Sequence, residues 1–178
     1  MRELQLYLDS IASISWSWNL KLNPAKCVVM RFGSRNVTSS PNYSIFGTPL
    51  SSVTKFRDLG VIVDSALRFH CHIDLVVGRT SSMMINILRS TVCRTVKFMV
   101  TLWVSHLRPL IEYGSCVWNV GYLGDLRRLE SLQRRWTREA IGMCGLDYEE
   151  RLRRIGLFSV EGRLLRIDLV KVWKCFHG

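Results

Sequence analysis

The stretches NLKLNPAKCVVMRF (residues 19–32) and FRDLGVIVD (residues 56–64) decide the fold class of this chain. In the first, the pair Asn23-Pro24 stops a helix and makes a turn, and the apolar, β-branched run over residues 26–32 predicts a short buried strand. The second stretch has the same strand composition, with Leu59-Gly60 near its middle. Both stretches therefore predict β-structure in the early part of the chain.

Further strands and an initial helix complete the predicted N-terminal part. Residues 43–46 and 53–63 have strand composition and are separated by Gly47-Thr48-Pro49, which is a turn by composition. Residues 34–41 are polar and are predicted to form a loop. Residues 2–14 place apolar side chains at helical spacing, so an amphipathic helix is predicted to precede a small antiparallel sheet.

The remainder of the chain is predicted to be helical. From residue 72 onward the apolar period is close to that of a helix, and few helix breakers occur before Pro109. The boundary is therefore predicted near residue 68, and the fold class is α+β, mostly α. Asp125 and Ser159 are the predicted N-caps of two later helices. The first of these helices has one apolar face, formed by Leu126, Leu129, Leu132, Trp136 and Ala140.

Two patterns in these later helices allow either structural or binding roles. The arginine-rich segment over residues 127–138 can bind RNA, but Glu130–Arg134 and Arg135–Glu139 are i, i+4 pairs that would neutralise part of its charge. A solvated, salt-bridged face is therefore the favoured interpretation. The last helix carries an apolar stripe that needs a partner surface, formed by Leu165, Leu169, Val172, Trp173 and Phe176.

The tryptophans of the helical part have two possible roles. All lie within apolar patterns, so they are interpreted as core or interface residues rather than as base-stacking platforms. They are Trp103, Trp118, Trp136 and Trp173.

Composition favours a globular chain with a polyanionic partner. The 178 residues are 48% hydrophobic, which is ample for a packed core, and the net charge of +11 favours nucleic acid ahead of a membrane surface. Residues 21–108 contain 12 Lys/Arg against three Asp, which leaves +9, whereas residues 123–178 contain 12 against eight Asp/Glu, which leaves +4. The earlier segment is therefore the better candidate for binding phosphates.

The polar residues do not predict a metal or redox site. The six cysteines include no CxxC pair, so neither a zinc ribbon nor a redox motif is indicated, and reduced intracellular thiols are expected. Asp58 and Asp64 on one strand would stand about 20 Å apart, which is too far to bridge two catalytic ions. The longest nearly uncharged apolar run, residues 98–107, is too short for a membrane-spanning helix.

Five stretches in a consistent order resemble one protein family. They are LQLYLDSI…WSWNLKLNPAKCVVM, FRDLGVIVDSALRFHCHI, LWVSHLRPLIEYGSCVWN, LESLQRRWTR and RLRRIGLFSVEGRLLRIDLVKVWKCFHG. They are similar to the C-terminal part of the reverse transcriptase, an RNA-directed DNA polymerase, encoded by non-LTR (LINE-type, jockey-like) retrotransposons. The resemblance implies a palm remnant over residues 1–68, thumb-like helices over residues 69–122 and a C-terminal helical region over residues 123–178.

The resemblance also implies partners. These are an RNA template, a DNA primer and the missing N-terminal part of the polymerase, in the nucleus or in a cytoplasmic ribonucleoprotein, with no membrane. The catalytic aspartates of such an enzyme are not matched in this sequence. Magnesium is therefore implied only for the intact parent, no cofactor is expected for this chain, and the chain alone is expected to be inactive.

The resemblance assigns roles to seven residues. Lys26 falls on the lysine of motif D, a general acid for the departing pyrophosphate, although for the chain alone an ordinary lysine at a strand start is favoured. Leu59 and Gly60 fall on the primer-grip turn of motif E, where a plain hairpin glycine is an equal alternative. A thumb needs basic residues on rigid helices, a role that suits Arg79, Arg89, Arg94 and Lys97.

Two alternatives to a polymerase fragment follow from the same residues. The chain can be a non-catalytic basic helical module that binds RNA or DNA, or a decayed copy of an element. It can also fail to fold stably, because its sheet would have lost neighbouring strands and would expose their edges.

Overall fold

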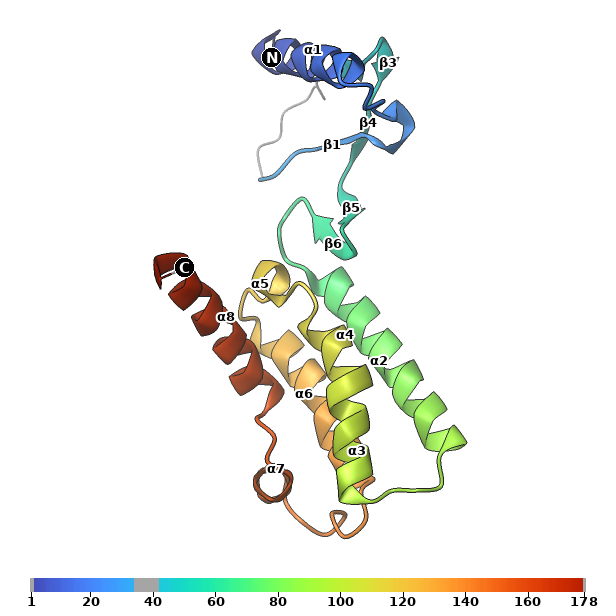
Figure 1. Ribbon diagram of the computed structural model, residues 1–178, viewed down its shortest axis with the longest axis vertical. Helices are drawn as coiled ribbons and strands as arrows, with labels where there is room; N and C mark the ends of the chain where they lie inside the picture. The colour runs from blue at the N-terminus through green and yellow to red at the C-terminus, as the bar shows by residue number, and fades with distance from the viewer. Residues whose placement is uncertain (1, 34–41, 178) are drawn as a thin grey trace. The chain divides into compact units, whose positions relative to one another are not determined.

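The computed structural model describes residues 2–33 and 42–177, so the predicted loop over residues 34–41 lies outside the described residues. The chain forms two compact units, Met1–Leu67 and Arg68–Gly178 (Figure 1). The first holds one α-helix and all the described strands, and the second is helical. The predicted α+β, mostly α fold class is confirmed. None of the helices in the described residues has the length and apolar character needed to cross a bilayer.

The first unit begins with the predicted amphipathic helix, which extends to Ser17. The Asn23 side chain then caps a short 3-10 turn by accepting a hydrogen bond of 3.0 Å from the backbone N–H of Ala25. The elements of this unit are α1 (Arg2–Ser17), η1 (Pro24–Lys26), β1 (Val28–Met30), β2 (Ser44–Ile45), β3 (Thr48–Pro49), β4 (Ser51–Val53), β5 (Lys55–Asp58) and β6 (Val61–Asp64).

The strands of the first unit form three two-stranded ladders among the described residues. The predicted antiparallel pairing holds for β2–β3 and β5–β6, whereas β1 and β4 pair in parallel, with Val29 opposite Ser52. A parallel pair requires a long connection, and residues 31–50 supply it. The predicted turn at Gly47-Thr48-Pro49 lies one residue earlier, because Thr48 and Pro49 form β3.

Helix α1 is held to β2 by a side chain rather than by a large core. The Gln5 amide donates to the Ser44 carbonyl at 2.9 Å and accepts from the Ser44 N–H at 3.1 Å. Among the described residues of α1, Ala12 and Ser15 are buried. Large apolar side chains beside this buried side of α1 remain exposed, namely Leu4, Tyr7, Ile11 and Ile14.

The second unit packs its helices around three buried tryptophans, Trp103, Trp118 and Trp136. Helix α6 lies against α2, α7 and α8 (Figure 1), and its predicted apolar face is largely buried. The elements are α2 (His70–Ser90), α3 (Val96–Leu102), η2 (Trp103–Leu107), α4 (Arg108–Glu112), α5 (Ser115–Trp118), α6 (Leu123–Arg138), α7 (Tyr148–Ile155) and α8 (Val160–His177).

A π-helical turn, η2, joins α3 to α4. Pro109 lies two residues beyond the end of η2. It has no N–H to donate to the carbonyl four residues earlier, and its ring would clash with that carbonyl. The chain widens by one residue instead, so the N–H of Arg108 bonds to the carbonyl of Trp103. Pro109 therefore shapes a continuous helical segment rather than ending it.

One of the two predicted N-caps is confirmed. Ser159 Oγ accepts a hydrogen bond of 3.1 Å from the N–H of Gly162 at the start of α8. The prediction for Asp125 is wrong, because α6 begins two residues earlier, at Leu123, and Asp125 lies in its first turn. The Asp125 carboxylate instead bonds the side chains of His70 and Arg128.

Arg151 of α7 is a buried cation that holds α7 to the end of α6. Its guanidinium donates to Thr137 Oγ1 at 3.1 Å, to the Leu146 carbonyl at 2.7 Å and to the Arg134 carbonyl at 3.2 Å. Within the described residues its charge has no carboxylate in ion-pair range. Carbonyl dipoles near the negative C-terminal end of α6 stabilise it instead.

Tyr148 completes this junction. Its hydroxyl donates to the Glu130 carboxylate, and its ring lies 4.8 Å from the Arg134 guanidinium and 5.5 Å from that of Arg151. Burial, with the hydrogen bond to Glu130, raises the pKa of the Tyr148 hydroxyl, so it stays protonated.

Candidate nucleic-acid interface

The solvent side of α2 carries the clearest basic surface among the predicted site residues. Arg79, Ser82, Asn86 and Arg89 are all exposed and lie within about 80° of one another around the helix. We call these four residues the α2 basic face. Its two arginines lie about 15 Å apart along the axis. The opposite side of α2 is fixed in the core by Ile73, Val76, Thr80 and Met84.

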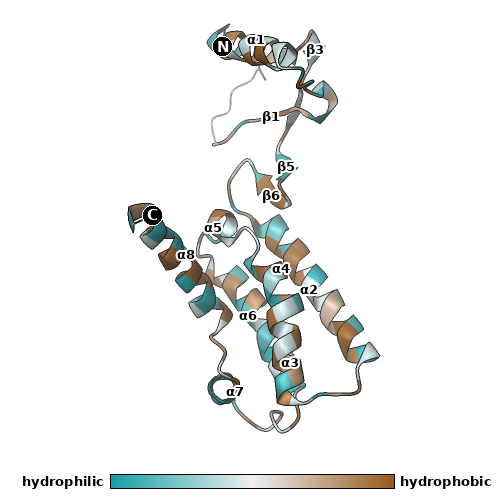
Figure 2. Cartoon of the chain, viewed as in Figure 1, coloured by the Kyte–Doolittle hydropathy of each residue, from teal (hydrophilic) through white to brown (hydrophobic). Residues whose placement is uncertain are grey.

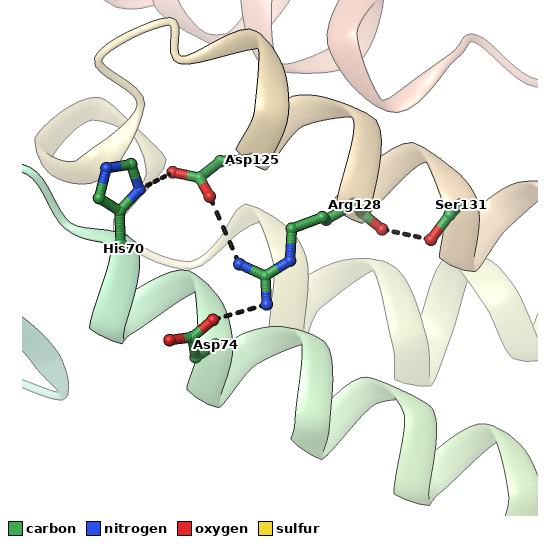
Figure 3. A network of polar contacts seen from close by, with 5 residues as sticks. All are labelled: His70, Asp74, Asp125, Arg128 and Ser131. Carbon is green, nitrogen blue, oxygen red and sulfur yellow. Dashed lines mark hydrogen bonds and ion pairs between the residues drawn. The ribbon is translucent and has the colours of Figure 1, made fainter.

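Asp74, the single acidic residue of α2, is bonded away from this face (Figure 3). Its carboxylate accepts a hydrogen bond of 2.6 Å from Arg128 of α6, whose guanidinium also lies 3.5 Å from Asp125. Asp125 accepts a further contact of 2.6 Å from His70 Nδ1. The bond to Asp74 raises the pKa of Arg128. The network thus joins α2 to α6 and leaves no acidic residue on the α2 basic face.

Arg94 and Lys97 are placed differently from each other. Arg94, in the loop before α3, is half-buried and forms an ion pair with Glu139 at the end of α6. Part of its charge is therefore offset, and its guanidinium also positions the loop. Lys97 is exposed in the first turn of α3.

The predicted salt bridges of the arginine-rich helix are wrong. Glu130 bonds Tyr148 and the N–H of Glu161, and Glu139 bonds Arg94, so neither carboxylate pairs with an arginine of its own helix. Arg135 donates to Ser81 of α2 at 3.1 Å. The tertiary structure supplies better-placed partners for both carboxylates than an exposed i, i+4 neighbour does.

Two arginines of α6 belong to the segment over residues 127–138, for which the sequence favoured a solvated, salt-bridged face over RNA binding. Arg127 and Arg138 are exposed on one side of α6, with Ser131 between them, and neither forms an ion pair within the described residues. Their helical phase indicates that they share one side of α6. The sequence does not show, however, that Glu130 and Glu139 bond residues outside this helix and leave these arginines unpaired by them.

Lys26 is exposed at the end of the 3-10 turn η1, just before β1. The described part of the chain places no acidic cluster that could hold metal ions near it or elsewhere. Asp58 and Asp64 lie at opposite ends of the β5–β6 ladder, where Asp58 faces Val61 and Asp64 faces Lys55. These residues do not form the donor set that a pair of magnesium ions requires.

Leu59 and Gly60 form a two-residue turn between β5 and β6. Both have positive φ, of 44° and 91°, as a type I′ hairpin turn requires. Glycine adopts this conformation freely, whereas a leucine there costs about 1–2 kcal/mol. Leu59 is also 84% exposed, so the tip presents a strained, apolar side chain to solvent.

Replacing Leu59 with asparagine is expected to stabilise this hairpin by about 1 kcal/mol, because asparagine tolerates positive φ and Asn-Gly is the preferred pair in this turn. Amide hydrogen exchange of β5 and β6 should slow accordingly. Leu59→Ala is the control, since it removes the apolar side chain but keeps the backbone cost. Equal exchange in all three proteins would show that the turn stores no strain.

A partly enclosed cavity of about 170 Å³ lies in the second unit. At its rim Glu112 accepts from Arg163 at 2.7 Å and lies 3.5 Å from Arg108. This ion pairing offsets one of the two positive charges. Trp103, Ile111, Leu157, Phe158, Val160 and Leu164 supply the apolar lining.

Sequence reasoning also missed the structural roles of Arg128 and Arg151. In α7, Tyr148, Arg151 and Ile155 recur at i, i+3 and i+7, so the arginine stands on the helix face that packs inward. The inward position of Arg151 in this pattern could have indicated that the arginine is buried. The partners of Arg128 lie on another helix, and no local pattern indicates them.

Comparison with known proteins shows similarity to the polymerases of mobile elements. The chain is 28% identical over 146 residues to the RNA-directed DNA polymerase from mobile element jockey of Drosophila melanogaster, and 27% identical over 142 residues to its namesake from Drosophila funebris. Each match covers 78% of this chain and 15% of the relative. The probable RNA-directed DNA polymerase from transposon BS of Drosophila melanogaster is 26% identical over 147 residues, which are 80% of this chain and 16% of the relative.

The chain therefore spans about 15% of the length of the curated relatives that it matches. No family model and no solved structure matches it. The resemblance to jockey-like reverse transcriptases is confirmed, and the small share covered is consistent with a fragment of such a polymerase.

Proposed function

We propose, from the premise that this chain is related to the reverse transcriptases of jockey-like elements, that it grips the backbone of a primer–template duplex. The observation that carries the proposal is the α2 basic face. Arg79 and Arg89 stand on a helix whose other side is buried, and the helix's one carboxylate is bonded to Arg128. Basic side chains on a rigid helix suit phosphate contacts, which position a duplex without reading its sequence.

Lys97 adds a cation at the start of α3, and Arg94 stays in the proposed set with part of its charge offset by Glu139. In this proposal residues 69–122 act as a thumb, residues 123–178 support it through α6, and RNA template and DNA primer are the ligands. The exposed arginines of α6, Arg127 and Arg138, can extend the contact.

The first unit supplies its own proposed contacts, as a palm remnant. The strained tip at Leu59-Gly60 is a backbone turn that a nucleic acid strand can approach closely, since Gly60 has no side chain. Exposed apolar side chains along α1 support a further proposal, that the missing N-terminal part of the polymerase covers this helix. Lys26 would serve as a general acid only in that intact enzyme.

Charge removal from the α2 basic face tests the proposed grip. The double variant Arg79→Gln/Arg89→Gln is expected to bind an RNA–DNA duplex roughly ten-fold more weakly, and the slope of log affinity against log salt should fall by about 1.8, for two lost phosphate contacts. Fluorescence anisotropy across a salt series measures both quantities.

The matched control is Arg153→Gln/Arg154→Gln, which removes two exposed arginines from α7. Its slope should stay close to that of the original chain. If the control lowers the slope as much as the α2 variant does, binding reflects overall charge and the proposed grip is wrong. A chain with no measurable salt dependence would contradict nucleic-acid binding altogether.

We also propose that the chain does not polymerise DNA by itself, because its described acidic residues do not assemble a two-metal site. Primer extension with the purified chain, an RNA template and magnesium should give no product. A magnesium-dependent product would contradict this proposal while leaving the grip untouched.

A further inference from the structure

Helix α8 has apolar residues on two opposite faces. Val160 and Leu164 are buried where α8 packs against α6. The opposite side is also apolar but remains open to solvent. Figure 2 shows hydrophobic and hydrophilic residues alternating along the ribbon of α8. Its five large side chains are 54% to 81% exposed, and they are Leu165, Leu169, Val172, Trp173 and Phe176. We call these residues the α8 stripe. A helix that is apolar on both sides needs a second covering surface.

The α8 stripe follows a coiled-coil heptad. Leu169 and Phe176 occupy a positions, and Leu165 and Val172 occupy d positions, so these four residues make one seam. Positions c and f instead hold Leu164 and Val160, which pack against the rest of the unit. Folding of this unit therefore leaves the seam available to another helix.

The side chains of the seam are also spaced to receive a partner. An open groove of about 540 Å³ runs along this side of α8, and side chains of this one helix line it. In a coiled coil, each a or d side chain enters a hole between four side chains of the facing helix. The groove is lined by Arg166, Leu169, Val170, Val172, Trp173, Phe176 and His177.

The charges beside the seam favour a parallel over an antiparallel partner helix. Glu161 falls at a g position and Arg166 at the e position of the following heptad, and both are exposed. In a parallel pair of helices a g residue lies opposite that e residue of the partner, so Glu161 of each copy would meet Arg166 of the other. An antiparallel pair sets e against e and g against g, and these two charges would not meet.

We propose that the α8 stripe pairs in parallel with the α8 stripe of a second copy of this chain, which gives a two-fold symmetric dimer. The interface is isologous, because the same residues serve on both sides. A lipid surface suits this helix less well, since Glu161 and Asp168 stand beside the seam, whereas membrane-surface helices carry basic polar faces.

The apolar seam is tested by sedimentation equilibrium of the 178-residue chain without nucleic acid. The original chain should dimerise, and Leu169→Gln should be monomeric with unchanged helical circular dichroism. Ile11→Gln, which alters a similarly exposed residue of α1, should leave the dimer intact. A monomeric original chain overturns the proposal. Association lost equally through Ile11→Gln overturns it too, because non-specific apolar contact would then be the cause.

The orientation is tested by exchanging charges. Glu161→Arg should weaken the dimer roughly ten-fold, because two symmetry-related attractions become repulsions. Adding Arg166→Glu should restore the original dissociation constant. A double variant as weak as the single one would overturn parallel pairing, and the matching result for Arg166→Glu alone checks that neither change acts through folding.

Discussion

Replacing the buried Arg151 with methionine is expected to destabilise the second unit by about 3 kcal/mol. Methionine keeps most of the apolar stem but removes three donors, and the Leu146 and Arg134 carbonyls would then be buried without this partner. Replacing an entire buried ion pair with apolar residues can be harmless, but here two acceptors are backbone groups that no mutation removes. Urea denaturation followed by far-UV circular dichroism measures the loss.

Arg153→Met is the matched control on the same helix. Arg153 is 73% exposed and pairs with Glu150 at the surface, so its loss should cost no more than about 0.5 kcal/mol. Similar stability losses for the two variants would show that Arg151 does not join α7 to α6. A loss confined to Arg151→Met would establish it as the residue that fixes this junction.

Replacing Trp136 with alanine is expected to cost about 4 kcal/mol. Trp136 is 1% exposed, and its indole N–H donates to the Met99 carbonyl at 3.0 Å. It also meets Val100 of α3 and Ile155 of α7 around a small gap beside α6. Its removal therefore opens a cavity where three helices meet, and thermal unfolding should show the loss.

A second variant separates the hydrogen bond from the packing. Trp136→Phe keeps an aromatic ring but removes the indole bond to the Met99 carbonyl, which keeps its bond from the Trp103 N–H, so an intermediate loss of about 1–2 kcal/mol is expected. This variant also remains informative if Trp136→Ala does not fold. Equal stability of Trp136→Phe and the original chain would show that packing alone accounts for the role of Trp136.

The helices could be predicted from the sequence because their apolar residues recur with a helical period over many residues. Helix α8, with Ser159 as its cap, and the inward face of α6 follow directly from that period. The parallel pairing of β1 and β4 could not be predicted in this way. Alternation along a strand indicates which side chains share a face, but it does not specify the direction of the neighbouring strand.

The candidate binding residues also differ in whether local sequence or tertiary structure determines their surroundings. Exposure of Arg79 and Arg89 follows from helical phase, a local property of α2. The partners of Arg94 and Arg128 are carboxylates at residues 139 and 74, far along the sequence. Local spacing instead favoured ion pairs of Glu130 and Glu139 within α6. In the folded chain Glu130 bonds Tyr148 of α7, and Glu139 bonds Arg94 in the loop between α2 and α3. Such long-range competition for charges is set by tertiary structure.

The π-turn before Pro109 is a further feature that the sequence could not predict. Proline was recognised as a helix breaker, but whether a chain ends or widens there depends on the packing of residues on both sides. Trp103 and Leu107, at the two ends of the turn, are both buried, so the helix continues across the defect.

The most direct test of the proposed grip is an NMR titration of the chain with an RNA–DNA duplex, in which arginine Nε–Hε signals are followed. The side-chain signals of Arg79 and Arg89 and the backbone amide of Lys97 should shift first, and those of Arg153 and Arg154 should remain in place. Shifts that spread equally over all exposed arginines, or that are confined to α7, would contradict a grip built on α2.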